Sequence, residues 1–389
     1  MEKNSNDQII GKDRVRSNHQ IRSNHQIKRR YQLICVILAG ILAALLIVLL
    51  IILPPSKGEV LQFTDENGEL LEGSIAEKTR IKVNGTEIGM IILGENKNAP
   101  VLLVCGGGPG IPEYLLESFY PSVLPRHFVV CYFDYRGTGL SYRKADPEEM
   151  TTEQFLSDVD AITDHLRERF SADKIYIMGH SFGSYMALHA ACEHPEKYEA
   201  YLAVSQVVDS RESELRAYDY MLEQYRVEGN TKMVKKFEEY PIRTDEEAYR
   251  KFCTSGLRDQ AMHELGVGTT REMDSVVSGI FFPSLKCTAY TQKERIDLWK
   301  GKIGANHFAV TDDCFSSNAF EAVPALEIPV YFFVGEYDHT CDKDLQKEYF
   351  EFLTAPEKKL FSYPEAAHSP VFEDGDLTDQ YLAEILGAG

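Results

Sequence analysis

The segment that most restricts the possible folds of this chain is residues 175–183, I-Y-I-M-G-H-S-F-G. A short apolar run leads into the pattern G-x-S-x-G, which is typical of a sharp turn between a strand and a helix. Glycines at positions 179 and 183 have no side chains to collide with the neighbouring strand and helix. Because five residues can match by chance, the prediction depends on the strand before the turn and the helix after it.

Such a turn would expose Ser181 as a nucleophile. A serine hydroxyl reacts poorly at neutral pH unless a base lies beside it and hydrogen-bond donors receive the developing oxyanion. The N–H of Phe182, the residue after the serine, is predicted to be one of these donors. The helix that follows also points its positive end at the site. These features predict a serine hydrolase.

An acid and a base should follow the serine, each after a strand. Asp338 follows the apolar run 330–334, and His368 follows the run 360–363. We predict that His368 is the general base and that Asp338 orients its imidazole. The order Ser, Asp, His is that of the α/β-hydrolase arrangement.

Other residues compete for these two roles. Glu336 and Asp342 are alternative acids close to Asp338. His180 and His339 are weaker alternatives for the base, because the first should point away from the turn and the second follows the acid.

The second oxyanion donor should come from a loop after an early strand. The apolar run 101–105 leads into G-G-G-P-G at 106–110, where the backbone can approach a substrate closely. Gly108 is the preferred donor and Gly107 the second choice. A phosphate-binding loop is disfavoured, since no G-x-G-x-x-G opens a helix here and no Walker lysine follows.

The spacing of apolar runs predicts the fold class. Apolar strands alternate with amphipathic segments, one of which begins at a capping box over 151–154. The result should be an α/β-hydrolase fold with a doubly wound, mostly parallel sheet. Strands are expected at 80–83, 87–93, 101–105, 128–133, 174–178, 200–205, 328–334 and 359–362.

About 120 residues separate the strand at 200–205 from the next one, far more than a strand-helix-strand unit needs. Capping boxes at 244–247 and 291–294 predict that this stretch is helical. We therefore expect a first part of the core at 76–205, a helical cap or lid at 206–325 and a second part of the core at 326–389.

Residues 33–53 carry no charged or strongly polar side chain and would span roughly 32 Å as a helix. Basic residues at 28–30 precede the run, and two prolines at 54–55 follow it. The positive-inside rule then predicts a transmembrane helix at 32–53, a disordered basic cytoplasmic tail at 1–31, a linker at 54–75 and an extracytoplasmic body anchored in the cell membrane. A cleaved signal peptide would have a shorter apolar region, and a buried helix would have a polar face. The tail contains the tandem repeat R-S-N-H-Q-I, whose role is open.

The formal charge is −19, and residues 32–389 hold 33 basic against 57 acidic residues. A body this acidic disfavours nucleic acid as a partner. The eight cysteines follow no metal-ligand spacing, so neither a metal nor a cofactor is expected. Cys253, Cys287 and Cys314 could form a disulfide in an extracytoplasmic body.

Together these motifs resemble those of the proline iminopeptidase-like branch of the α/β-hydrolases. The resemblance covers residues 80–387 and includes G-G-G-P-G, D-Y-R-G-T-G-L-S at 134–141, G-H-S-F-G, the G-x-x-D at 335–338 and the final histidine. The family's first loop reads H-G-G-P-G, so Gly106 stands where the family has histidine. In this resemblance Asp134 and Arg136 are scaffold behind the site.

The resemblance implies hydrolysis of an amide or ester through an acyl-enzyme, with removal of an amino-terminal residue, often proline, from small peptides. In such aminopeptidases acidic cap residues bind the free amine. The acidic residues available here are Asp209, Glu212, Glu214 and Glu223.

Three functions follow from these patterns. The first is a membrane-anchored serine aminopeptidase, and the alternative is a carboxylesterase that acts on small acyl esters. A tethered hydrolase-fold protein that binds without turnover is a third. Epoxide hydrolases and dehalogenases of this fold carry aspartate at the turn, so Ser181 argues against both.

Overall fold

The computed structural model describes residues 34–45, 47–48, 50–144 and 146–387. The chain divides into two compact units, Met1–Pro55 and Ser56–Gly389. The first unit contains the helix Ile34–Ile52, which is long and apolar enough to cross a membrane when judged by length and composition. The expected tail at 1–31, with its tandem repeat, lies outside the described residues.

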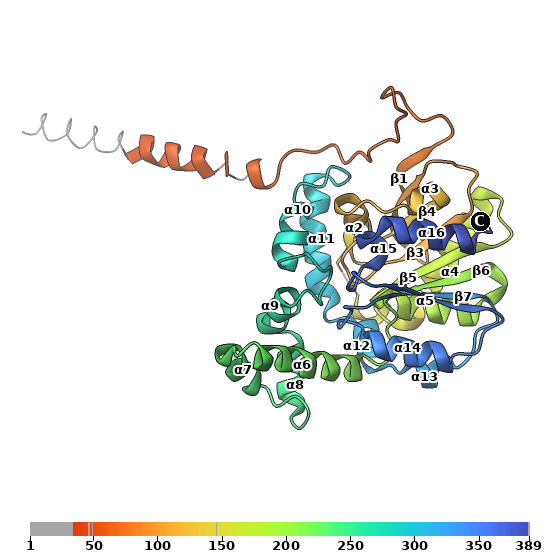
Figure 1. Ribbon diagram of the computed structural model, residues 1–389. Coiled ribbons are helices and arrows are strands. Elements are labelled where there is room, and N and C mark those ends of the chain that lie inside the picture. Colours follow the sequence, from red (N-terminus) through yellow and green to blue (C-terminus); the bar gives the residue numbers. More distant parts are fainter. Residues whose placement is uncertain (1–33, 46, 49, 145, 388–389) are drawn as a thin grey trace, which may run out of the picture. The chain divides into compact units, whose positions relative to one another are not determined.

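The second unit, which we call the body, is built on one eight-stranded sheet (Figure 1). The strand order is β1-β2-β4-β3-β5-β6-β7-β8; β2 is antiparallel to both of its neighbours, and the remaining pairs are parallel. This confirms the mostly parallel α/β-hydrolase sheet. The strands are β1 (Ile75–Val83), β2 (Thr86–Gly94), β3 (Val101–Cys105), β4 (Val129–Phe133), β5 (Ile175–His180), β6 (Tyr198–Val204), β7 (Val330–Gly335) and β8 (Lys358–Tyr363).

Both faces of the sheet are covered by helices. In β3, Val101, Leu103 and Cys105 pack into one hydrophobic cluster and the alternate residues into the other, as the two-residue period of a strand requires. Figure 1 shows α15 and α16 on one side of the sheet and α14 on the other. The helices of these layers are α2 (Tyr114–Phe119), α3 (Leu124–His127), α4 (Thr152–Phe170), α5 (Phe182–Glu193), α14 (Lys343–Phe352), α15 (Pro370–Glu373) and α16 (Gly375–Ile385), with short 3₁₀ turns η1 (Gly139–Ser141), η2 (Pro147–Glu149) and η3 (Pro195–Lys197).

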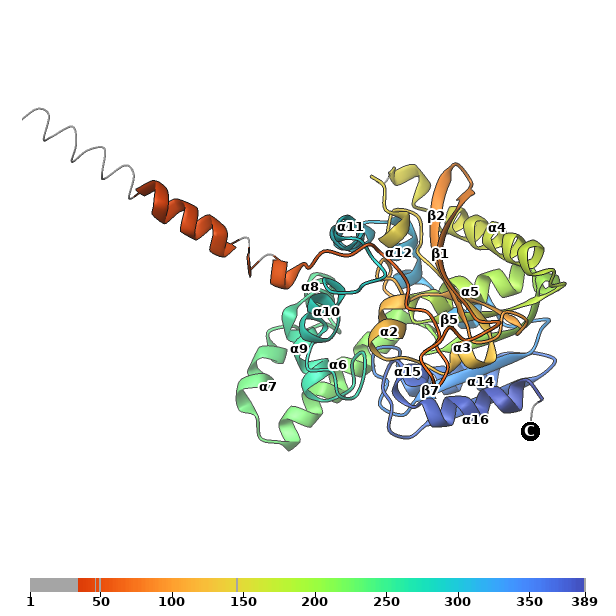
Figure 2. The same ribbon diagram turned by 90° about the horizontal axis from the view of Figure 1, so that it is seen from above.

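A helical insertion, residues 205–329, lies between β6 and β7. Its first four helices share a separate hydrophobic cluster and gather beside the sheet in both views (Figures 1 and 2). The elements are α6 (Ser210–Val227), α7 (Thr231–Glu238), α8 (Glu246–Cys253), α9 (Gly256–Glu264), the π-helical turn η4 (Val277–Phe281), α10 (Phe282–Ser284), α11 (Gln292–Ala305), α12 (Ala309–Ser316) and α13 (Ala319–Ala322).

Two helix starts in the insertion test the capping predictions. At α11, Thr291 accepts the N–H of Glu294 and the Glu294 side chain accepts the N–H of Thr291, so this capping box is confirmed. The box predicted at 244–247 is wrong, because Asp245 and not Thr244 caps α8. A carboxylate accepts the same N–H bonds as a hydroxyl and adds a favourable charge at the helix N-terminus.

Part of the segment expected to be a linker packs on the body. The Ser56 hydroxyl donates to the Thr288 carbonyl at 2.7 Å, the Gln62 side chain donates to the Ala76 carbonyl at 2.8 Å, and Val60 is buried.

All eight cysteines are free thiols. Cys287 and Cys314 are buried, and Cys253 is partly exposed. The three cysteines considered for a disulfide are therefore unpaired in this structure.

Candidate active site

The predicted nucleophile, acid and base all follow strands of the parallel part of the sheet. Ser181 follows β5, Asp338 follows β7 and His368 follows β8. Because the carboxyl ends of parallel strands meet at one edge of the sheet, these loops are brought together there.

Ser181 occupies a strained turn, with φ 55° and ψ −126°, at the start of α5. A Cβ at Gly183 would lie 1.9 Å from the carbonyl oxygen of Cys105, and a Cβ at Gly179 would lie 2.5 Å from the Cα of Ser184. Only glycine at both positions lets the helix approach the strands this closely. The serine itself remains partly exposed at the turn.

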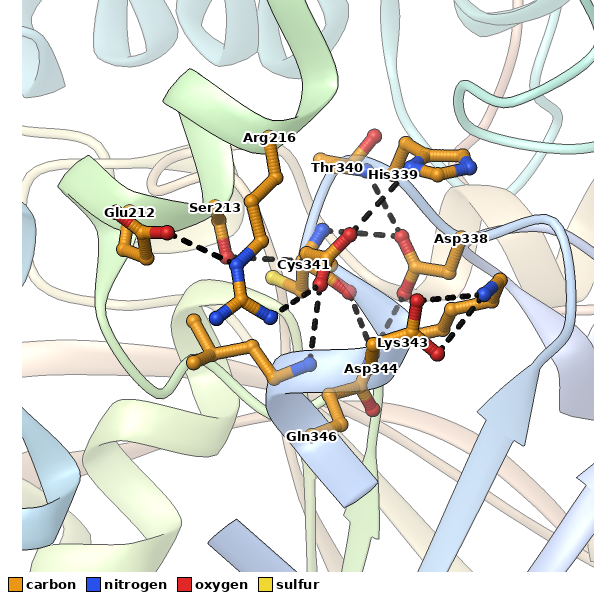
Figure 3. Close-up of polar contacts among 12 residues, drawn as sticks. Glu212, Ser213, Arg216, Asp338, His339, Thr340, Cys341, Lys343, Asp344 and Gln346 are labelled. Carbon is orange, nitrogen blue, oxygen red and sulfur yellow. Dashed lines mark hydrogen bonds and ion pairs between the residues drawn. The ribbon is translucent and has the colours of Figure 1, made fainter. Parts of the chain in front are cut away.

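The Asp338 carboxylate is fully buried beside the imidazole of His368. The Nδ1 atom of His368 lies 3.0 and 3.1 Å from the two carboxylate oxygens. Asp338 also accepts the N–H groups of Thr340 and Cys341, both at 3.0 Å, and the Gln346 side chain at 3.1 Å (Figure 3). Burial would raise the pKa of Asp338, but the contact with His368 and the donated hydrogen bonds outweigh it and lower the pKa.

The competing acids have other partners. Glu336 binds Lys347, and Asp342 caps α14 and accepts from Arg216 at 3.3 Å. His339 stacks on Tyr220 with ring centroids 3.9 Å apart. Of the three carboxylates, Asp338 is the one in contact with His368.

His180 holds the backbone of the predicted base. Its Nε2 lies 2.8 Å from the carbonyl oxygen of His368, and its Nδ1 lies 2.7 Å from the carboxylate of Glu113. A carbonyl oxygen only accepts, so Nε2 carries a proton. Burial alone would lower the pKa of His180, but the Glu113 carboxylate outweighs burial and the net shift is upward.

The loop 106–110 lies against the nucleophile turn. A Cβ at Gly107 would be 3.2 Å from the Cβ of Ser181. The N–H of Gly107 already donates to Glu113 at 2.9 Å, whereas within residues 56–144 and 146–387 the N–H groups of Gly108 and Phe182 have no protein acceptor. This pattern favours Gly108 over Gly107 as the second oxyanion donor.

The helical insertion reaches the same loop through Lys302 of α11. Its ammonium donates to the carbonyl of Pro109 at 3.1 Å and lies 3.5 Å from that of Gly108. Burial lowers the pKa of Lys302 to about 8.

The loop that carries His368 is fastened by Glu373. One carboxylate oxygen accepts the N–H groups of Ala367 at 3.0 Å and Ser369 at 3.1 Å, and the other accepts the N–H of Arg271 at 2.7 Å. Burial raises the pKa of Glu373 to about 7 although these donors oppose the shift. The N–H of His368 donates to Gly268 at 3.3 Å, so the insertion contacts this loop at two points.

Asp134 and Arg136 lie behind the site. Asp134 accepts the N–H of Leu140 at 2.6 Å, and burial raises its pKa to about 7. The Arg136 guanidinium, 1% exposed, binds both oxygens of Asp158 at 2.6 and 2.7 Å. Asp134 thus braces backbone, Arg136 binds a buried carboxylate, and neither side chain binds Ser181, Asp338 or His368.

The four acidic residues considered for an amine site have partners within the protein. Glu212, Glu214 and Glu223 pair with the arginines Arg216, Arg258 and Arg226. Asp209 caps α6 and accepts from Asn318. Among the described residues, no group of three or more His, Cys, Asp or Glu side chains could hold a metal ion.

Glu113 and Glu373 are the site residues that sequence reasoning missed. Glu113 lies next to the apolar stretch 114–116, and a carboxylate beside an apolar run was the available signal in the sequence. Glu373 carried a similar signal, since it follows the apolar residues 370–372 in the sequence.

Comparison with known proteins gives the family. A family model described as alpha/beta hydrolase fold matches residues 100–375. The chain is 30% identical over 310 residues to the probable aminopeptidase YbaC of Bacillus subtilis, which covers 78% of this chain and 94% of that protein. It is 21% identical over 322 residues to a proline iminopeptidase of Thermoplasma volcanium, which covers 80% of this chain and 97% of that protein.

Among solved structures, a proline iminopeptidase of Mycobacterium smegmatis matches with a TM-score of 0.59 and 15% identity, covering 80% of this chain and 98% of that one. This similarity concerns the fold. The fold and the sequence relatives together show that the chain belongs to the α/β-hydrolases, within their proline iminopeptidase-like branch.

Proposed function

We propose that the protein is a membrane-anchored serine aminopeptidase in which Ser181 is the nucleophile, His368 the general base and Asp338 the orienting acid. The observation that carries this proposal is the contact of the buried Asp338 carboxylate with Nδ1 of His368, in a body whose Ser181 occupies the strained turn. The names of the sequence relatives support the peptidase type.

In the proposed reaction, Nε2 of His368 takes the proton of Ser181 as the serine oxygen attacks the carbonyl carbon. The N–H groups of Gly108 and Phe182 stabilise the oxyanion. The bond to the leaving amine then breaks, and His368 returns the proton to the amine nitrogen. Water attacks the acyl-enzyme with the same proton transfers, which releases the carboxylic acid and restores Ser181.

A fluorophosphonate probe tests the nucleophile. We expect the probe to label the purified protein and expect no labelling of Ser181→Ala. Persistent labelling of that variant would assign the reactive serine elsewhere. His368→Ala should lower turnover by roughly 10³-fold or more, and activity near that of the wild type would refute its role as the base.

A carboxylesterase is the second candidate, and one observation favours it. Three of the four cap carboxylates suited to an amine are paired with arginines. Turnover of prolyl and alanyl arylamides should therefore be compared with turnover of acetyl and butyryl aryl esters. Arylamide cleavage supports the aminopeptidase, whereas ester cleavage alone would replace it with the esterase.

The proposed location rests on the helix Ile34–Ile52 and on the basic residues at 28–30 that precede it. We propose that the amino terminus is cytoplasmic and that the body, with its core at 76–205 and 326–389 and its cap at 206–325, lies outside. A membrane-impermeant fluorophosphonate should then label intact cells that produce the full chain. Labelling only after lysis would reverse the orientation.

A further inference from the structure

One buried side chain, that of Glu113, connects three parts of the site. It binds the loop 106–110 and His180, and His180 in turn binds the backbone of His368. The Oε1 of Glu113 lies 2.7 Å from Nδ1 of His180, and its Oε2 accepts the N–H of Gly107 at 2.9 Å. His180 extends this hydrogen-bond network to the third segment, because its Nε2 donates to the carbonyl of His368 at 2.8 Å. Glu113 and His180 are each only 3% exposed.

Glycine at position 106 makes room for this carboxylate. A Cβ at Gly106 would lie 2.8 Å from the Cβ of Glu113 and 3.2 Å from its Oε2. A side chain at 106 and the observed position of Glu113 therefore exclude one another. The histidine that the family pattern has at this position could not coexist with this arrangement.

The direction of the hydrogen bonds sets the geometry of the loop. Glu113 accepts the N–H of Gly107, whereas the next N–H, that of Gly108, has no protein acceptor among residues 56–144 and 146–387. The same carboxylate orients His180, and His180 shares the carbonyl of His368 with the hydroxyl of Ser205, which donates at 2.8 Å.

We propose that Glu113 and His180 are positioning residues that hold the oxyanion loop and the base in register with Ser181. This inference rests on the proposed function and assigns a role that the nucleophile, acid and base do not cover. Neither residue is proposed to exchange a proton with substrate.

Three substitutions of Glu113 distinguish the effect of its hydrogen-bond geometry from the effect of its charge. In Glu113→Gln, the amide oxygen accepts the N–H of Gly107 and the amide nitrogen donates to Nδ1 of a neutral His180, so all three hydrogen bonds survive. In Glu113→Asp the charge remains, but the shorter side chain cannot reach both partners. Glu113→Ala removes both bonds.

The test is the rate of fluorophosphonate labelling of Ser181 in the full-length protein, with kcat and KM on the best arylamide or ester. Displacing an oxyanion donor or reacting atom by about 1 Å costs roughly 100-fold, so Glu113→Ala should label about 10- to 100-fold more slowly, with the loss in kcat rather than in KM. Glu113→Gln should stay within about tenfold of the wild type, and Glu113→Asp should be slower than Glu113→Gln.

Glu117→Ala is the matched control. Glu117 is also buried and accepts from Tyr132 at 2.8 Å and from Ser122 at 2.6 Å, but it touches no part of the loop. Its loss should lower the melting temperature and leave the labelling rate near that of the wild type.

The outcomes are distinguishable. A wild-type protein that is not labelled refutes the proposed function and this inference with it. A labelled wild type with Glu113→Ala equally fast overturns this inference alone. If Glu113→Ala does not fold, the order of the other two variants decides, and Glu113→Asp at least as fast as Glu113→Gln overturns the proposal.

Discussion

Replacing Arg136 by methionine should destabilise the body strongly and leave the chemistry of the site intact. The guanidinium is buried and makes two hydrogen bonds with Asp158, at 2.6 and 2.7 Å, and a third with Glu149 at 3.1 Å. Asp158 is 2% exposed, so the substitution leaves its charge buried without a cation. The side chain of Asn84, 2.9 Å from Asp158, only partly compensates.

Removing one partner of a buried ion pair costs about 3–5 kcal/mol. For a large domain, about 2 °C of melting temperature corresponds to each kcal/mol. Arg136→Met should therefore melt about 6–10 °C below the wild type. Because Arg136 binds none of Ser181, Asp338 and His368, the rate of fluorophosphonate labelling at a temperature below both transitions should be unchanged.

Arg143→Met is the matched control, because Arg143 binds the same Glu149 in a half-exposed pair with side-chain exposures of 36% and 37%. Such a pair contributes about 0–1 kcal/mol. The assay is thermal unfolding of the solubilised full chain, followed by intrinsic fluorescence. The reasoning fails if both variants melt at the same temperature, or if Arg136→Met melts normally and loses labelling. Adding Asp158→Leu to Arg136→Met should restore part of the stability, since no unpaired charge then remains.

Three further predictions concern single residues. Gly183→Ala should yield no folded protein, because its Cβ would lie 1.9 Å from the Cys105 carbonyl oxygen; Gly256→Ala, whose Cβ meets open space, should express and melt like the wild type. Burial raises the pKa of Glu373 to about 7 in the folded state, so its protonated side chain stabilises the fold fully below about pH 4.5. This stabilisation is lost as the pH rises to 7, and the free energy of unfolding falls by up to about 3 kcal/mol. Urea unfolding of Glu373→Gln should show a flatter dependence between pH 5 and 8 than the wild type, and an identical slope would refute that assignment. Asp338→Asn should lower kcat by about 10³- to 10⁴-fold with little change in the melting temperature, as expected for a histidine held in the wrong tautomer; a loss below tenfold would remove Asp338 from the acid role.

The elements that the sequence predicted well are those whose signal is local. The run 101–105 is apolar at every position because both faces of a central strand are covered, and β3 has those bounds. The amphipathic segment predicted to begin at the capping box over 151–154 is α4, which Thr151 caps. The order of Ser181, Asp338 and His368 along the chain could likewise be read from motifs, since each follows an apolar strand.

The features that the sequence did not reveal depend on residues far apart in the chain. Glu113 contacts His180, which is 67 residues away in the sequence, and Glu373 accepts from the backbone of Arg271, which is 102 residues away. Neither pairing leaves a periodic or contiguous pattern. The choice of Asp245 over Thr244 as a helix cap is a different, local case, because both residue types can cap a helix and only the path of the chain before α8 decides between them.

The motifs of the core do not reveal every residue that holds this site, because residues of the helical insertion also bind it. Gly268 accepts the N–H of His368, the N–H of Arg271 binds Glu373, and Lys302 donates to the carbonyl of Pro109. The insertion thus contributes hydrogen bonds to the loop of His368 and to the loop 106–110. Any movement of the insertion that separates these atoms must therefore break hydrogen bonds to the loop of His368 and to the loop 106–110.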